Sequence, residues 1–117
     1  MALLHGIPLY DGDLEAAEGL PQAVRDLKAR VIACDGLLLA TPEYNNGVPG
    51  VLKNAIDWLS RPVSDIPQVF GNRPVAPVAV SGASPGGFGT ILTQDAWLSV
   101  LRTLRMCPWF GDDVARR

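Results

Sequence analysis

Two short polar segments of the sequence carry residue types that suit the binding of a flat, polar ligand. The first, Thr41 to Gly50, reads TPEYNNGVPG and combines two prolines, an aromatic ring and an Asn-Asn-Gly turn. Asparagine and glycine permit positive φ, and the second proline suits the first turn of a helix. Such a loop directs backbone N–H groups outward at a helix start, where a polar ligand edge can bind. The same residues also fit a strand-to-helix turn that binds nothing.

The second segment, Ser81 to Gly89, reads SGASPGGFG and contains four glycines. Glycine lets the backbone approach a flat ligand closely, although a flexible loop is an equally simple interpretation. The spacing matches neither the dinucleotide-binding GxGxxG motif nor a P-loop. Glu43 is a lone loop carboxylate, which more often caps a turn than transfers a proton. The single histidine, His5, lies outside both segments, so no Ser-His-Asp or Cys-His set is possible. No residue is predicted to be catalytic, and any chemistry would come from a cofactor.

The elements around these segments place both at one edge of a sheet. Apolar runs predict strands at 36–40 and 74–80. The run at 36–40 is typical of a strand covered by helices on both faces. So few residues also fit a piece of buried helix, but the bounding Asp-Gly and Thr-Pro favour the strand. Pro77 is unusual in the strand at 74–80, because proline is rare in a central strand. The remaining expectations are helices that begin at Leu20-Pro21, at about Val51 and at about Thr90 (ending near Met106), and exposed connections at 5–19 and 63–72. This alternation predicts a parallel sheet with right-handed crossovers, whose ligands bind at the C-terminal ends of the strands.

Composition excludes several classes of function. The 117 residues suffice for one domain, and 48% hydrophobic with 19% charged residues is typical of a soluble globular chain. A net charge of −2 gives no basic face for nucleic acid, and no apolar run is long enough to cross a membrane. Cys34 and Cys107 have no CxxC spacing, which favours a reduced, cytoplasmic setting, and one histidine cannot anchor a multi-histidine metal site.

The stretch TPEYNNGVPGVLKNAIDWLSRP, from Thr41 to Pro62, closely resembles a strand-loop-helix signature of the NADPH-dependent FMN reductase family. That family includes quinone, azo-dye and chromate reductases. The later stretch GASPGGFGTILTQDAWL resembles the family's second flavin loop. With PLYDGDLE near the start, the resemblance covers most of residues 7–111. It implies an α/β, flavodoxin-like fold, a doubly wound parallel sheet with helices on both faces.

The resemblance also implies a cofactor site and a reaction. FMN would lie at the C-terminal edge of the sheet, and hydride would pass from NAD(P)H to flavin N5 and on to a flavin, quinone or similar small-molecule acceptor. Family members form dimers or tetramers, so a homo-oligomer is expected, with no nucleic-acid or membrane partner. The residues implied to line FMN are Pro42, Glu43, Tyr44, Asn45 and Gly47 from the first segment and Ser84, Gly86 and Gly87 from the second.

Against complete family members, residues 1–117 are expected to form a single, partial domain. The first βα unit with its phosphate-holding loop, the second strand and the final strand are expected to be absent. Two strands and three helices bury a small core, so a lone chain should be marginally stable unless another chain completes its sheet. The alternative function is therefore a non-catalytic, truncated flavodoxin-like module that lacks a competent site for the FMN phosphate.

Overall fold

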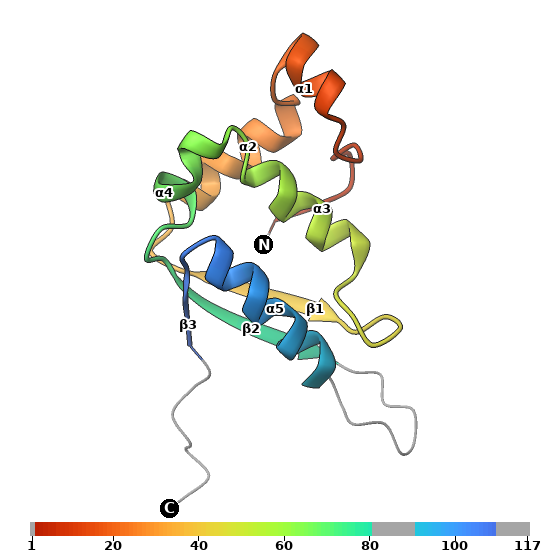
Figure 1. Cartoon of the computed structure of the whole chain (residues 1–117), viewed down its shortest axis with the longest axis vertical. Coiled ribbons are helices and arrows are strands. Elements are labelled where there is room, and N and C mark those ends of the chain that lie inside the picture. The colour runs from red at the N-terminus through yellow and green to blue at the C-terminus, as the bar shows by residue number, and fades with distance from the viewer. Residues whose placement is uncertain (1, 81–90, 110–117) are drawn as a thin grey trace, which may run out of the picture.

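The computed structural model of the chain describes residues 2–80 and 91–109. Three parallel strands, β1 (Leu37–Pro42), β2 (Pro74–Val80) and β3 (Cys107–Pro108), form one sheet in the order β1-β2-β3 (Figure 1). The predicted α/β class and parallel sheet are confirmed. The prediction of only two strands was wrong, because β3 is a two-residue strand, too short to produce an alternation pattern in the sequence.

The three predicted helices are present with closely matching starts, and the last ends at Thr103 instead of Met106. Proline occupies the N-cap of two of them, as expected for residues that pre-set the first turn. The helical elements of the described chain are α1 (Gly12–Glu18), α2 (Gln22–Ile32), α3 (Gly50–Leu59), the 3₁₀ turn η1 (Val63–Asp65), α4 (Ile66–Val69) and α5 (Ile91–Thr103).

Two segments that were predicted to be exposed connections contain helices instead. In the first, the side chain of Asp11 accepts the N–H groups of Asp13 and Leu14, and Gly19 ends α1 with a φ of 76°. An aspartate N-cap, acidic residues in the first turn and a terminal glycine are start and stop signals that the composition of this segment hides. In the second, α4 ends at Val69 and is followed by Phe70, and the side chains of both residues are fully buried.

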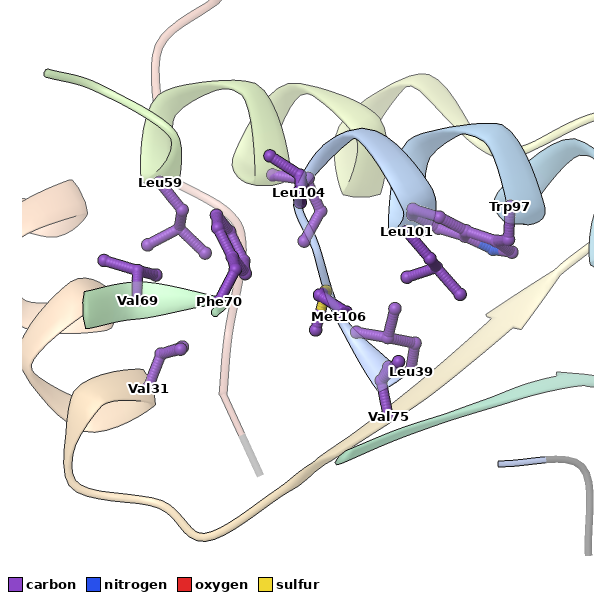
Figure 2. Close-up of a cluster of buried hydrophobic side chains, with 11 residues drawn as sticks. Val31, Leu39, Leu59, Val69, Phe70, Val75, Trp97, Leu101, Leu104 and Met106 are labelled. Carbon is purple, nitrogen blue, oxygen red and sulfur yellow. The ribbon is translucent and has the colours of Figure 1, made fainter. Parts of the chain in front are cut away.

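The core lies between the helices and one face of the sheet. Figure 2 shows side chains from α2, α3, α4 and α5 meeting Leu39 of β1 and Val75 of β2. Trp97 and Phe70 are among the largest side chains in it that water does not reach. The full cluster is Val31, Leu39, Ile56, Leu59, Val69, Phe70, Val75, Trp97, Leu101, Leu104 and Met106.

The opposite face of the sheet is exposed, so the expectation of helices on both faces is not met in the described residues. Along β1, Leu39 and Thr41 are buried, whereas Leu38 is 69% exposed and its alternate neighbours Ala40 and Pro42 are also exposed. The cause is topological. The chain moves across the sheet in one direction, from β1 to β2 to β3. Right-handed crossovers that all run in one direction place their helices on the same face of the sheet.

Pro77 lies inside β2 without costing a hydrogen bond to β1. The neighbouring Val75 turns its carbonyl toward β3, where it accepts the N–H of Trp109 at 2.7 Å. Backbone groups of residues two apart on a strand face the same side, so the nitrogen of Pro77 also faces away from β1. β2 pairs with β3 only through Pro74 and Val75. Pro77 lies past these two residues, so its missing N–H interrupts neither ladder.

Candidate functional site

The loop that follows β1, residues 43–49 and here called the β1 loop, lies at the C-terminal edge of the sheet. The backbone N–H of Tyr44 donates to the carbonyl of Gly47 at 3.1 Å, and the N–H of Gly47 donates back to Tyr44 at 3.0 Å. Between them Asn45 and Asn46 have φ values of 50° and 62°. Positive φ at both central residues defines a type I′ turn, which asparagine tolerates better than most residues. The Asn-Asn-Gly signal in the sequence is confirmed as a tight turn.

This turn presents an aromatic ring to solvent. Tyr44 is 63% exposed, so most of its ring is accessible to a ligand. Asn45 and Asn46 beside it are also exposed and offer amide groups that donate and accept hydrogen bonds. Pro42, the last residue of β1, is exposed on the sheet face that carries no helix. The β1 loop therefore combines one apolar plane with polar groups at its rim.

Glu43 and Gly47 differ from these residues, because their polar atoms have partners within the chain. The backbone N–H of Thr93, in the first turn of α5, donates to Oε2 of Glu43 at 3.0 Å. The hydroxyl of Thr93 donates to the carbonyl of Gly47, also at 3.0 Å. The β1 loop is thus joined to the helix that follows the glycine-rich segment. Glu43 does cap a backbone N–H, as a lone loop carboxylate was expected to do.

The start of α3 supplies further backbone donors at the same edge. Pro49 is its N-cap, and no side chain caps the helix there. The first N–H groups of a helix have no intrahelical partner, and in α3 they belong to the exposed residues Gly50 and Val51. These N–H groups carry the positive end of the helix dipole, which favours a partially negative ligand edge beside the β1 loop.

The N-terminal segment fixes α3 in place from its other side. The indole Nε1 of Trp58 and the amide Nδ2 of Asn54 both donate to the carbonyl of Pro8 at 2.8 Å. Tyr10 contacts the same two residues. Its N–H donates to Oδ1 of Asn54 at 2.9 Å, and its ring packs edge-on against Trp58 with 4.9 Å between the ring centroids. The helix that begins at the β1 loop is therefore held by side chains and not only by its apolar face.

An ion pair closes the same contact near the end of α3. Arg61 donates from Nε to Oε2 of Glu15 at 2.9 Å, and the Tyr10 hydroxyl donates to the same oxygen at 2.7 Å. The Tyr10 hydroxyl first, and the Arg61 guanidinium second, hold the pKa of Glu15 below its ordinary value. The hydrogen bond to Glu15 raises the pKa of Tyr10 in turn. These shifts belong to the contact between residues 10–15 and Arg61, which follows α3, and not to the β1 loop.

The structure therefore brings together five of the eight residues predicted from the sequence. Pro42, Glu43, Tyr44, Asn45 and Gly47 share one edge of the sheet, whereas Ser84, Gly86 and Gly87 lie outside the described residues. Thr93 was missed. Its only sequence signal is a hydroxyl near a helix start, and its two partners lie 50 and 46 residues away.

Other features of the described chain do not compete with this edge. A hollow of about 340 Å³ between α3 and α5 includes no residue of the β1 loop. Within residues 2–80 and 91–109, no cluster of histidine, cysteine, aspartate or glutamate is arranged to hold a metal ion. In the same ranges no helix combines the length and apolar character that spanning a bilayer requires.

Known proteins resemble the chain in sequence and in structure. An NAD(P)H-dependent FMN reductase of Pseudomonas aeruginosa is 49% identical over 94 residues, which are 80% of this chain and 47% of that protein. A quinone reductase of Escherichia coli K12 is 46% identical over 85 residues, 71% of this chain and 41% of that protein. The chain thus spans about half the length of these relatives.

The structural comparison agrees. FerB, a flavoenzyme NAD(P)H:(acceptor) oxidoreductase from Paracoccus denitrificans, superposes with a TM-score of 0.78 at 32% identity, covering 96% of this chain and 58% of FerB. The sequence model of the NADPH-dependent FMN reductase family matches residues 2–115. Because that match extends over almost the whole sequence, the chain belongs to the NADPH-dependent FMN reductase family.

Proposed function

We propose that this chain supplies a flavin-binding edge of an NAD(P)H-dependent FMN reductase-type oxidoreductase. The observation that carries the proposal is the β1 loop, where an exposed tyrosine ring sits on a hydrogen-bonded type I′ turn at the C-terminal end of a parallel strand. In open α/β sheets this is the edge at which ligands bind. The family match and the relatives named as FMN and quinone reductases support the same function.

The residues of the β1 loop suit the isoalloxazine ring of FMN. That ring system is flat, with an apolar dimethylbenzene end and most of its polar atoms toward the pyrimidine end. Tyr44 offers an exposed plane, and Asn45 together with the N–H groups at the start of α3 offers polar partners. We propose that Pro42, Tyr44 and Asn45 face the ring, with Ser84, Gly86 and Gly87 approaching it from the second segment.

The chain's own part in the reaction is to bind and orient. When bound, FMN supplies the hydride chemistry between NAD(P)H and the acceptor. Hydride transfer depends on close, stacked geometry more than on a protein acid or base, which fits a described site without a histidine or a free carboxylate pair. The backbone N–H groups of Gly50 and Val51 would stabilise negative charge on a ring edge placed before them.

The proposal extends to partners and location. The names of the relatives favour a small-molecule acceptor such as a flavin or a quinone. We propose a homo-oligomer, either dimer or tetramer, on the family resemblance. A cytoplasmic setting agrees with the two exposed, unpaired cysteines in the described chain.

The proposal is tested by titrating the protein with FMN and following flavin fluorescence, then adding NADPH under anaerobic conditions. We expect saturable binding and bleaching of the flavin absorbance. Tyr44→Ala should weaken FMN binding by about 2- to 10-fold, the range that one aromatic contact commonly contributes. Tyr10→Phe is the matched control, because it alters a tyrosine outside the β1 loop. A folded wild-type protein that neither binds nor reduces FMN would reject the enzyme and favour a non-catalytic module.

A further inference from the structure

Thr93 holds the two ends of the β1 loop at once. Its backbone N–H binds the carboxylate of Glu43, and its hydroxyl binds the carbonyl of Gly47, each at 3.0 Å. Thr93 itself is fully buried, whereas Glu43 and Gly47 are half-buried, so both donors lie inside the fold. Both contacts reach across the fold, from the third residue of α5 to the end of β1.

The two contacts have different physical roles. The N–H of Thr93 lies in the first turn of α5, where it lacks an intrahelical acceptor and where the helix dipole favours a negative charge. The Glu43 oxygen satisfies both needs. The carbonyl of Gly47 also accepts the N–H of Tyr44, and this bond pairs with the one from the Gly47 N–H to the Tyr44 carbonyl that closes the type I′ turn. The Thr93 hydroxyl is therefore connected to the base of the turn that carries the exposed ring.

We propose that Glu43 and Thr93 are positioning residues of the flavin site, which together fix the β1 loop against the start of α5. The inference rests on the proposed function. Because Thr93 lies in the first turn of α5, this clamp holds the turn that carries the Tyr44 ring at a fixed position relative to that helix. FMN would then meet a surface that is already ordered, and binding would cost less conformational entropy. Glu43 acts through Thr93 and does not contact the flavin.

The experiment compares Glu43→Ala, Glu43→Gln, Thr93→Val and the double variant Glu43→Ala/Thr93→Val in FMN titrations of the folded protein. Losing one buried hydrogen bond of the clamp should raise the Kd for FMN by about 3- to 10-fold. Glu43→Gln should retain most of the affinity, because its amide oxygen still accepts the N–H of Thr93. The double variant should bind little worse than either single variant, because both changes open the same clamp.

A second readout does not need FMN. Amide hydrogen exchange at Tyr44 and Thr93 should accelerate in Glu43→Ala and Thr93→Val, since both variants release the loop from the helix. Thr103→Val is the matched control. It removes a threonine hydroxyl from the same helix, where that hydroxyl bonds only within α5 to the carbonyl of Ser99. Neither the Kd for FMN nor exchange at Tyr44 should change in this control.

The outcomes separate the two proposals. Wild-type protein without affinity for FMN would overturn the proposed function and the clamp's role toward FMN together. Wild-type protein that binds FMN, with unchanged Kd in Glu43→Ala and Thr93→Val, would overturn the clamp alone. A loss of stability without a change in Kd would assign the pair to folding only. Fully additive losses would overturn the shared clamp, because the two residues would then act independently. Glu43→Gln as weak as Glu43→Ala would overturn the role of the hydrogen bond to Thr93, because the amide oxygen still accepts that bond.

Discussion

The buried lysine of α2 allows a quantitative test of how the segment after α3 is held. Nζ of Lys28 donates to Oδ2 of Asp65 and to the carbonyl of Arg61, both at 2.6 Å. The lysine side chain is only 8% exposed, whereas that of Asp65 is 37% exposed. Asp65→Ala leaves a nearly buried ammonium with one acceptor. Breaking a fully buried pair costs about 3–5 kcal/mol, and because water reaches the Asp65 side we expect about 2 kcal/mol.

The sign of the coupling makes this prediction specific. Lys28→Met removes the charge that Asp65→Ala strands, so the double variant should be more stable to urea than Asp65→Ala alone. Unfolding in urea at pH 7, followed by far-UV circular dichroism, gives the three free energies. Val63→Ala, an exposed change in the same turn, should stay within about 0.5 kcal/mol of wild type. If Asp65→Ala behaves like this control, or the double variant is the least stable, the reasoning is wrong.

The same pair predicts a pH dependence. The hydrogen bond from Lys28 lowers the pKa of Asp65 in the folded protein. A carboxyl group with a lowered folded pKa stabilises the protein fully above its unfolded pKa of about 3.9, and that contribution disappears as the pH falls through the lower folded pKa. The loss of stability below about pH 4 should therefore be shallower in Asp65→Ala than in wild type.

Two further predictions test the corrected features of the fold. Phe70→Ala should lower the free energy of unfolding in urea by about 3–5 kcal/mol, because Phe70 is fully buried although its segment reads as a loop. Val63→Ala should change it very little. A small effect of Phe70→Ala would place this segment outside the core. Leu38→Lys should leave the free energy of unfolding within about 0.5 kcal/mol, whereas Leu39→Ala should lower it by about 2–5 kcal/mol. Destabilisation by Leu38→Lys would mean that the outer sheet face is covered in solution.

Local sequence patterns predicted the elements whose residues repeat. The strand at 74–80 and the helices α2, α3 and α5 follow from continuous apolar runs or from 3.6-residue periodicity, and the bounds agree closely. The prediction for segment 63–72 failed because its six polar, proline and glycine residues outnumber its four apolar residues. Its burial depends on only a few side chains, chiefly Val69 and Phe70, and composition does not reveal which neighbours they meet.

The candidate site divides in the same way. Proline, tyrosine and asparagine of the β1 loop were predicted because turn chemistry is local, and the type I′ geometry follows from residues adjacent in sequence. Thr93 could not be predicted, because its role arises from two contacts about fifty residues away. A lone threonine in a helix is usually a surface residue without a role in binding. Only the folded arrangement of β1 beside β2 brings α5 to the loop.

The exposed outer face shows why an apolar run does not report how a strand is covered. Leu37, Leu38 and Leu39 are equally apolar, yet only the first and third turn toward the helices. Register places Leu38 beside Ala76, and the pairing of Val75 with Pro108 places Trp109 next in the same row. Leu38 and Trp109 are largely exposed, and Ala76 is half-buried. In the described sheet, right-handed crossovers in one direction leave this face without helices, so the apolar character of Leu38 does not indicate that a helix covers it.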